Sequence, residues 1–312
     1  MGGRKLEKIK QNPFVKKVGF NRIVLCCVLL LMYGLFCALT GGNFAGMNRI
    51  MSALNYAYFL GFLSLGVTFV IATGQIDFSI GPVMFCCALM SGYTLTTHGI
   101  SMPVAFLISI LVGFAFGLFN GYLVAYWSVP SFITSMASMN IAKTQSVSWP
   151  QAADPDNGWF RNLVRYNGFP VGLVILLVVA VICAIILNKT RIGRYILCLG
   201  SNKEAVRLSG VDVKKWEMLA FIICGVLVGM GAVSAYTTVQ PGYGDQYNNE
   251  AIAGCVMGGT SMAGGLASIS GTIIGVFIIA LLQEGILALG FTKDYQLIIT
   301  GVIVIVAVFS VV

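Results

Sequence analysis

The chain has 312 residues, of which 58% are hydrophobic and only 10% are charged, and its formal net charge is +8. Because soluble domains carry about 25% charged residues, this composition excludes an ordinary soluble protein with a separate catalytic domain. It predicts an all-α polytopic membrane protein. The basic residues gather in two short segments, so the positive charge does not indicate a nucleic-acid-binding protein.

The first of these segments is the N-terminal tail, residues 1–21, which contains six Lys and Arg residues and is followed by Arg22. Positive charge beside a membrane span favours the cytoplasmic side. We therefore expect a cytoplasmic tail, an uncleaved first span, and a single transmembrane domain over residues 22–312.

We expect about ten transmembrane helices joined by glycine-rich breaks, because one span needs roughly 20 apolar residues. The expected spans are 22–40, 50–73, 79–98, 101–126, 130–148, 169–188, 216–238, 249–263, 267–290 and 294–312. Counted from a cytoplasmic tail, they place segment 189–215 inside the cell, as its positive charge also requires. Segments 149–168 and 239–248 then lie outside, where they are available to an extracytoplasmic partner.

The second basic segment, Asn188–Lys215, carries seven Lys and Arg residues against Glu204 and Asp212. It predicts a short helix in which Ser201 is the N-cap, Glu204 completes a capping box, and Gly210 ends the last turn. A short capped helix between membrane spans, on the positively charged side, predicts contact with a cytosolic partner subunit.

Small residues recur at helical spacing in the apolar segments. Glycines occur every fourth residue at Gly113, Gly117 and Gly121, and again at Gly225 and Gly229. The pair Gly271 and Gly275 repeats the pattern. Such spacing lets helices approach closely in lipid, so we expect a compact helical bundle.

Asp77 is the only acidic residue between Glu7 and Asp154, and it lies in the motif TGQIDFSIGP, Thr73–Pro82. Two interpretations stay open. A carboxylate near lipid is costly and indicates a role in transport, whereas Asp77 is also placed to cap the following helix.

A second break, Gly258–Thr272, reads GGTSMAGGLASISGT. Backbone of this kind leaves the helical state at membrane depth only where it is buried in protein or lines water, and broken helices accompany transport pathways. We expect a large side chain at Gly259 to enter a close backbone contact. No Gly-Lys-Ser/Thr triplet occurs in the chain, so no ATP-binding P-loop is expected.

Other polar residues fall within expected spans. Helix-to-helix hydrogen bonding is the expected role of Asn120. For Glu284, the expected states are a paired carboxylate, a protonated acid, or a carboxylate in a water-filled path.

Taken together, four motifs resemble the permease subunits of ribose-type sugar ABC importers. They are TGQIDFSIG, NGYLVAYWSVPSFITSMASMNIA, GRYILCLGSNKEAVRLSGVDV and GGTSMAGGLASISGT, and their order and spacing match over about residues 50–312. Phe78, Ile80, Val206 and Ala267 are mild departures from the usual pattern. Residues 143–166 follow no pattern of that family.

This resemblance implies two permeases per transporter, a cytosolic ATPase pair that binds ATP and Mg, and an extracytoplasmic sugar-binding protein. It implies a bacterial plasma membrane location and no catalytic residue, metal or cofactor in this chain. The residues implied to couple to the ATPase are Gly200, Asn202, Glu204, Ala205, Arg207, Leu208, Ser209 and Gly210. The candidates for the translocation path or its gate are Asp77, Ser79, Gly81, Asn120, Gly258, Gly259, Thr260, Ser261, Gly264, Gly265 and Glu284.

Two other classes of function are less consistent with the residues. An ion-driven secondary transporter would use Asp77 and Glu284 as coupling carboxylates, but it gives the capped cytoplasmic helix no purpose. An intramembrane enzyme is disfavoured by a single histidine, His98, and by scattered acids. The residues leave open which sugar is carried and whether two copies of the chain or two sister permeases pair.

Overall fold

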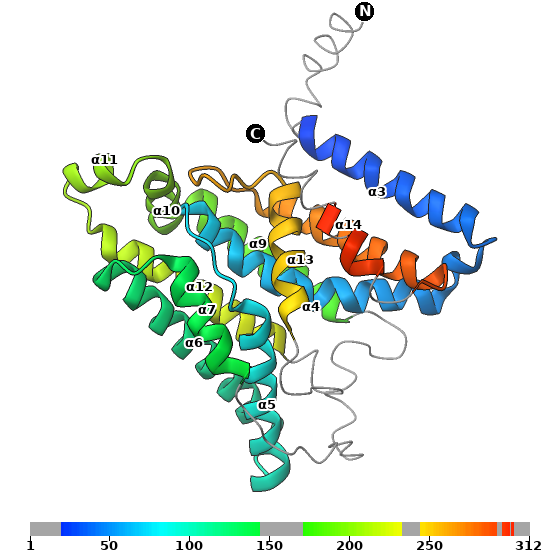
Figure 1. The fold of residues 1–312 in the computed structure, drawn as a ribbon, viewed down its shortest axis with the longest axis horizontal. Coiled ribbons are helices and arrows are strands. Elements are labelled where there is room, and N and C mark those ends of the chain that lie inside the picture. Colours follow the sequence, from blue (N-terminus) through cyan, green and yellow to red (C-terminus); the bar gives the residue numbers. More distant parts are fainter. Residues whose placement is uncertain (1–19, 144–170, 233–243, 292–294, 300, 303–312) are drawn as a thin grey trace, which may run out of the picture.

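A computed structural model describes residues 20–143, 171–232, 244–291, 295–299 and 301–302. Within these residues every regular element is a helix (Figure 1), which confirms the all-α prediction for that part of the chain. Nearly all of the basic tail, the expected outside loop 149–168 and residues 239–243 lie outside the described residues.

Most of the helices follow the expected spans with small shifts, while the ends of spans 130–148 and 216–238 and most of span 294–312 lie outside the described residues. Their bounds are α3 Phe20–Leu39, η1 Asn43–Ala45, α4 Met47–Ala72, α5 Ile80–His98, α6 Met102–Trp127, α7 Ser131–Lys143, α9 Val171–Lys189, α10 Arg191–Ser201, α11 Lys203–Leu208, α12 Val213–Gly231, α13 Asp245–Met257 and α14 Ile269–Ala288. Five described helices are long and apolar enough to cross a membrane, namely α3, α4, α6, α9 and α14.

The expected span 249–263 is wrong in both bounds. The helix found there, α13, has 13 residues and ends at Met257. At 1.5 Å per residue it is about 20 Å long, shorter than the roughly 30 Å hydrocarbon layer. The glycines that follow it form turns instead of a further helical turn.

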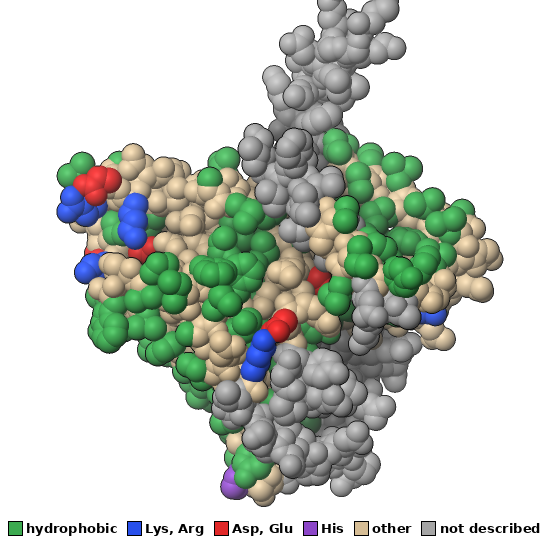
Figure 2. Space-filling view, viewed as in Figure 1, with side chains coloured by type: hydrophobic (Ala, Val, Ile, Leu, Met, Phe, Trp, Pro, Cys, Tyr) green, Lys and Arg blue, Asp and Glu red, His purple; other side chains and the backbone are tan. Residues whose placement is uncertain are grey.

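Helix α4 is the centre of the bundle. Of the residues in its most apolar stretch, 78% are buried, whereas the corresponding shares are 6% for α3, 22% for α6 and 28% for α9. Helices α3, α6 and α9 are apolar on all sides, although only a minor share of their residues is buried. This combination is typical of helices that face lipid. Figure 2 shows the hydrophobic side chains that cover much of one face of the molecule.

The predicted glycine packing joins α6 to α12. A Cβ built on Gly113 would overlap the carbonyl oxygen of Gly225, and one on Gly117 would lie against the backbone of Phe221. The Ser109 hydroxyl donates a hydrogen bond to the Gly229 carbonyl at 2.7 Å. Glycine is required here because the two backbones are in contact.

The same arrangement joins α13 to α14. A Cβ on Gly275 would overlap the carbonyl oxygen of Gly254, and one on Gly271 would overlap that of Gly258. Both predicted small-residue pairs therefore mark a helix interface.

The basic segment folds into two helices where the sequence predicted one. Helix α10 begins after Thr190, whose hydroxyl accepts a hydrogen bond from the Gly193 amide at 3.5 Å. Its buried residues are Gly193, Ile196 and Leu199, which are spaced three apart and so share one face. The arginines at positions 191 and 194 concealed this short apolar face in the sequence.

The predicted capping box is wrong. Ser201 is the last residue of α10, and its hydroxyl donates to the Leu197 carbonyl at 3.1 Å. The N-cap of α11 is Asn202, whose side-chain oxygen accepts from the Ala205 amide at 2.9 Å. Ser201 cannot cap α11 because its own backbone still belongs to the preceding helix.

The predicted end of α11 is confirmed. Gly210 has a φ of +80°, and its amide donates to the Arg207 carbonyl at 3.1 Å. Glycine adopts this left-handed conformation without a steric penalty.

We expect Gly225→Ala to weaken the α6–α12 interface, because its new methyl group overlaps the Gly113 carbonyl. Overpacking of this kind costs about 1–3 kcal/mol and should lower the melting temperature of the purified protein in detergent. The control is Gly34→Ala in α3, where nothing lies within 4 Å of the added atom. Equal melting temperatures for the two variants would contradict the interface.

We also expect Asn202→Ala to loosen α11 and Ser201→Ala to leave it intact. Loss of an N-cap costs about 1 kcal/mol, so the amides of residues 203–208 should exchange with deuterium about five-fold faster in Asn202→Ala. The opposite order of the two variants would restore Ser201 as the cap.

Candidate functional site

Three segments meet at the end of α10, immediately before α11, and form a contact that we call the backbone junction. It consists of residues 72–74 at the end of α4, 200–201 at the end of α10, and 264–265 between α13 and α14. The Gly265 amide donates to the Ala72 carbonyl at 3.0 Å. A Cβ on Gly200 would overlap both of those groups, and one on Gly264 would lie 2.7 Å from the Gly74 nitrogen. The contacts of Gly200 and Gly264 are thus between backbones, and the Ser201 hydroxyl lies against Gly265.

The junction explains the glycines of the second break. Gly74, Gly264 and Gly265 have φ values of +78°, +86° and +79°, which L-residues with a side chain rarely adopt. Gly200, predicted to couple to the ATPase, packs inside this junction and not on the exposed surface of α11.

The expected clash at Gly259 is wrong in its cause. Nothing lies within 4 Å of a Cβ at Gly259, which has a φ of +90°, whereas Gly258 contacts the Gly271 backbone closely. A substitution at Gly259 is thus strained by its backbone conformation, and Gly258 is the residue that would clash.

The hydroxyl residues of this turn hold its shape. The buried Thr260 side chain accepts from the Ser268 amide at 3.4 Å, and the Ser261 amide donates to the Leu266 carbonyl at 2.9 Å. Thr260 and Ser261, two of the residues predicted for the translocation path, therefore lie in the turn that contributes to the backbone junction.

An ion pair between an exposed lysine and a buried carboxylate ties α11 to the bundle. The Lys203 ammonium lies 2.8 Å and 3.0 Å from the two carboxylate oxygens of Glu217 in α12. The Gln75 side-chain amide donates to the same carboxylate at 2.9 Å. The Glu217 side chain is 4% exposed, while that of Lys203 is 57% exposed. One carboxylate therefore connects the exposed helix with the segment that follows α4.

Glu217 was not identified from the sequence, because it follows two lysines and resembles an ordinary surface residue. Helical spacing could have identified it. Val213, Glu217 and Phe221 occur every fourth residue and all are buried, so they share the inward face of α12. A carboxylate on that face requires a partner.

Asp77 lies in the non-helical segment between α4 and α5 and is 4% exposed. Its carboxylate accepts hydrogen bonds from the Ser79 amide at 2.8 Å and the Ser79 hydroxyl at 2.6 Å. Ser79 is the N-cap residue of α5, so Asp77 precedes the cap and the expected capping of the first turn by Asp77 is wrong. Among the described residues, no Lys, Arg or His forms an ion pair with it.

Asn120 of α6 connects this carboxylate to α7. Its amide nitrogen donates to the Ser79 hydroxyl at 3.1 Å, and its carbonyl oxygen accepts from the Ser138 hydroxyl. The expected helix-to-helix role of Asn120 is confirmed. Asp77, Ser79, Asn120 and Ser138 form one buried polar network across three elements.

The segment 73–79 joins the backbone junction to this network. Gly74 contacts the Ala263 carbonyl at one end, and beyond the other end the Gly81 amide donates to the Asn248 side chain at 2.7 Å. Figure 1 shows this connection running beside α13. Gln75, the partner of Glu217, lies within it.

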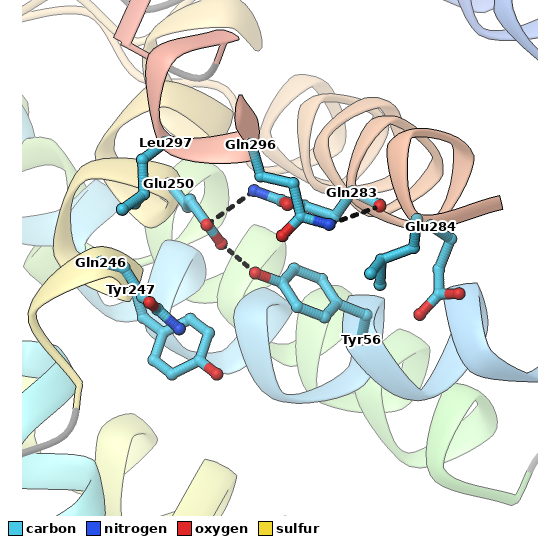
Figure 3. Close-up of a pocket in the computed structure, with 9 residues that line it drawn as sticks. Tyr56, Gln246, Tyr247, Glu250, Gln283, Glu284, Gln296 and Leu297 are labelled. Atoms are coloured by element: carbon cyan, nitrogen blue, oxygen red, sulfur yellow. Dashed lines mark hydrogen bonds between the residues drawn. The ribbon is translucent and has the colours of Figure 1, made fainter. Parts of the chain in front are cut away.

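Glu284 lies elsewhere. Its carboxylate is 3.8 Å from the Arg49 guanidinium, and it lines a pocket between α4, α13 and α14 that also contains Tyr56 and Glu250 (Figure 3). None of the other predicted path residues lines this pocket. The paired state expected as one possibility for Glu284 is the one found.

The outer surface of α11 is polar. Glu204 and Arg207 form an exposed ion pair at 2.5 Å, and Leu208 beside them is 75% exposed. Val206 is the buried residue of this helix. Asn202, Ala205, Ser209 and Gly210 are exposed. Figure 2 shows charged side chains gathered at this end of the molecule.

The hydrogen bond from the Arg207 guanidinium holds the pKa of Glu204 below its ordinary value of 4.5. A lowered pKa means that the pair contributes above about pH 4.5 and is lost as the pH falls through the lowered value. The pair is therefore charged throughout the physiological range.

The chain is similar in sequence to known permease proteins. Residues 49–308 match the family model described as "Branched-chain amino acid transport system / permease component". The ribose import permease protein RbsC of Escherichia coli (strain K12) is 31% identical over 85% of this chain and 86% of its own length. RbsC of Bacillus subtilis (strain 168) is 31% identical over 83% of both chains.

A xylose relative covers still more of the chain. The xylose transport system permease protein XylH of Haemophilus influenzae is 27% identical over 94% of this chain and 96% of its own length. No solved structure matches the chain. The chain therefore belongs to the family of ABC importer permease components, multi-pass membrane subunits that carry no cofactor and leave ATP hydrolysis to a separate chain.

Proposed function

We propose that this chain is the permease of an ABC importer that moves a ribose-type monosaccharide into a bacterial cell. An extracytoplasmic binding protein delivers the sugar, a cytosolic ATPase docks on α11, and a second copy or a sister permease completes the path. The names of the ribose and xylose relatives support a sugar as substrate. One observation about α11 carries the coupling role. Its outer surface is exposed to solvent, and Lys203 anchors its start to the buried carboxylate of Glu217.

The anchoring supports a mechanical route. When the ATPase pair closes, a force on α11 acts on Lys203 and on the backbone junction. Because the end of α10, immediately before α11, is in backbone contact with Ala72 and with the α13–α14 turn, α11 cannot shift far without moving the ends of α4 and of the α13–α14 turn. Segment 73–79 would then carry the shift to the Asp77 network, as part of a rocking motion between outward and inward states.

The orientation follows from charge. The basic tail and the α10–α11 end are cytoplasmic in this proposal, and about ten crossings complete the bundle. In agreement with this, the Arg22 guanidinium at the start of α3 lies 3.5 Å from the Ser268 hydroxyl, next to the turn that contacts α10. Arg22, which follows the basic tail, and the second basic segment are thus at one end of the described bundle.

The proposed function predicts that an ATPase from the same organism co-purifies with this permease. Replacing both Glu204 and Arg207 with Ala removes the exposed pair from α11 and should reduce co-purification and ATP-driven uptake at least five-fold. The matched control is Lys189→Ala, a charged residue at the end of α9. Full ATP-driven sugar uptake by the double variant would count heavily against docking on α11.

The anchor predicts a different phenotype. In Glu217→Gln the outer surface of α11 is unchanged, so the ATPase should still bind and hydrolyse ATP. The charge-assisted bond to Lys203 is weakened, and such bonds contribute about 1.5–3 kcal/mol. Sugar uptake per ATP hydrolysed should therefore fall several-fold in proteoliposomes, while Lys214→Gln, an exposed neighbour, should match the unaltered protein. Unchanged uptake in Glu217→Gln would remove the ion pair from the coupling route.

A further inference from the structure

We infer that the pocket between α4, α13 and α14 is a subsite that binds the hydroxyl groups of a neutral sugar. This inference rests on the proposed function and adds a site to it. We call it the Glu250 pocket (Figure 3). It encloses about 90 Å³, which is room for several water molecules and hence for part of a sugar ring.

The polar groups of the pocket are held in place. Glu250 is 3% exposed, and its carboxylate accepts hydrogen bonds from the Tyr56 hydroxyl and from the Gln283 amide, the latter at 2.8 Å. The Gln296 side-chain amide donates to the backbone carbonyl of Gln283 at 3.2 Å. A side-chain amide both donates to and accepts from hydroxyl groups, whereas a carboxylate accepts from them, and a fixed set of such groups determines ligand orientation.

The tyrosine rings of Tyr56 and Tyr247 line the pocket, and phenylalanine rings pack behind them. Tyr247 stacks on Phe85 with centroids 5.7 Å apart and an interplanar angle of 6°. Phe59 packs edge-on against both Tyr56 and Tyr247, each at 4.9 Å. An apolar ring surface beside hydrogen-bonding groups suits a sugar, which has C–H faces and a hydroxyl rim.

The charge of the lining argues against an amino acid. Its lining includes two carboxylates, Glu250 and Glu284, and no Lys or Arg among the described residues. The carboxylate of an amino acid would find no Lys or Arg in this lining to pair with, because the Arg49 guanidinium, which lies outside the lining, is already paired with Glu284. A neutral polyol needs no such partner. Tyr56 donates to one oxygen of the Glu250 carboxylate and Gln283 donates to the other, so a bound cation would have to share or displace these donors.

The pocket lies at the end of the bundle away from α11. Tyr56 is in the third turn of α4, whose other end forms the backbone junction, and Glu250 is in the second turn of α13. In the proposed orientation this end faces the extracytoplasmic side, where a binding protein would release its sugar.

The test uses the permease–ATPase complex in nanodiscs and a Gln246→Cys variant, because Gln246 lines the pocket and is partly exposed. Alkylation by N-ethylmaleimide is followed by peptide mass spectrometry, with the native exposed Cys198 as internal reference. We expect saturating d-ribose or d-xylose to slow alkylation at position 246 at least three-fold and to leave Cys198 unchanged, while leucine and sodium chloride have no effect.

Several results would overturn the subsite. They are equal rates with and without either sugar, equal slowing at both cysteines, or protection by leucine or by sodium. Uptake by the unaltered transporter, measured in parallel, separates the two claims. Sugar uptake without slower alkylation at position 246 would contradict only the binding role of the Glu250 pocket. Failure to import either sugar would contradict both the proposed function and that role.

A second variant keeps the inference independent of cysteine chemistry. Tyr56→Phe removes one hydroxyl and keeps the ring, so it should raise the sugar concentration needed to protect position 246 about five-fold, the effect of one lost hydrogen bond. The control is Tyr58→Phe on the same helix, outside the pocket. An unchanged protection curve in Tyr56→Phe would exclude the hydroxyl from the site.

Discussion

The buried carboxylate of Glu217 is the constraint on which the coupling end of this permease depends. A charge that is almost fully removed from water is tolerated only when it is paired and hydrogen-bonded. Lys203 and Gln75 supply those bonds from two different elements. The requirement to satisfy one carboxylate therefore fixes α11 and the segment after α4 in a single arrangement.

The membrane imposes the same requirement on the backbone. Segment 73–79 has no helical hydrogen bonds of its own over most of its length, and within a bilayer such backbone must be satisfied by protein. The Ser131 hydroxyl accepts from the Ile76 amide, and Asp77 accepts from Ser79. The polar network is thus a structural consequence of the unwound segment, and it becomes useful because that segment also reaches the backbone junction.

Much of this arrangement could be predicted from local pattern. Apolar run length placed α3, α4, α6, α9 and α14, and four-residue glycine spacing marked the glycines that form the α6–α12 and α13–α14 interfaces. These features depend on residues close together in the chain or on a simple repeat. The short α10 and the cap at Asn202 were missed, because basic residues obscured a three-residue apolar face and because two neighbouring polar residues competed for one capping position.

The site was harder to predict because its members come together only in the folded bundle. Asp77 and Asn120 were selected because they are polar residues in apolar segments. Nothing in the local sequence indicated that both would form a hydrogen bond with the Ser79 hydroxyl. Glu217 and Glu250 were passed over because each lies near the end of an expected span, where a carboxylate looks solvated. Their burial is set by the neighbouring helices, α4 above all, whose position cannot be obtained from the sequence of one helix.

The coupling route requires α11 and segment 73–79 to move as one unit. Hydrogen–deuterium exchange of the assembled transporter, compared with and without a non-hydrolysed ATP analogue, tests it directly. If the two are coupled, the exchange of residues 203–208 and of residues 73–79 changes together on nucleotide binding. A change in α11 with no change in residues 73–79 would contradict the coupling route through Glu217 and the backbone junction.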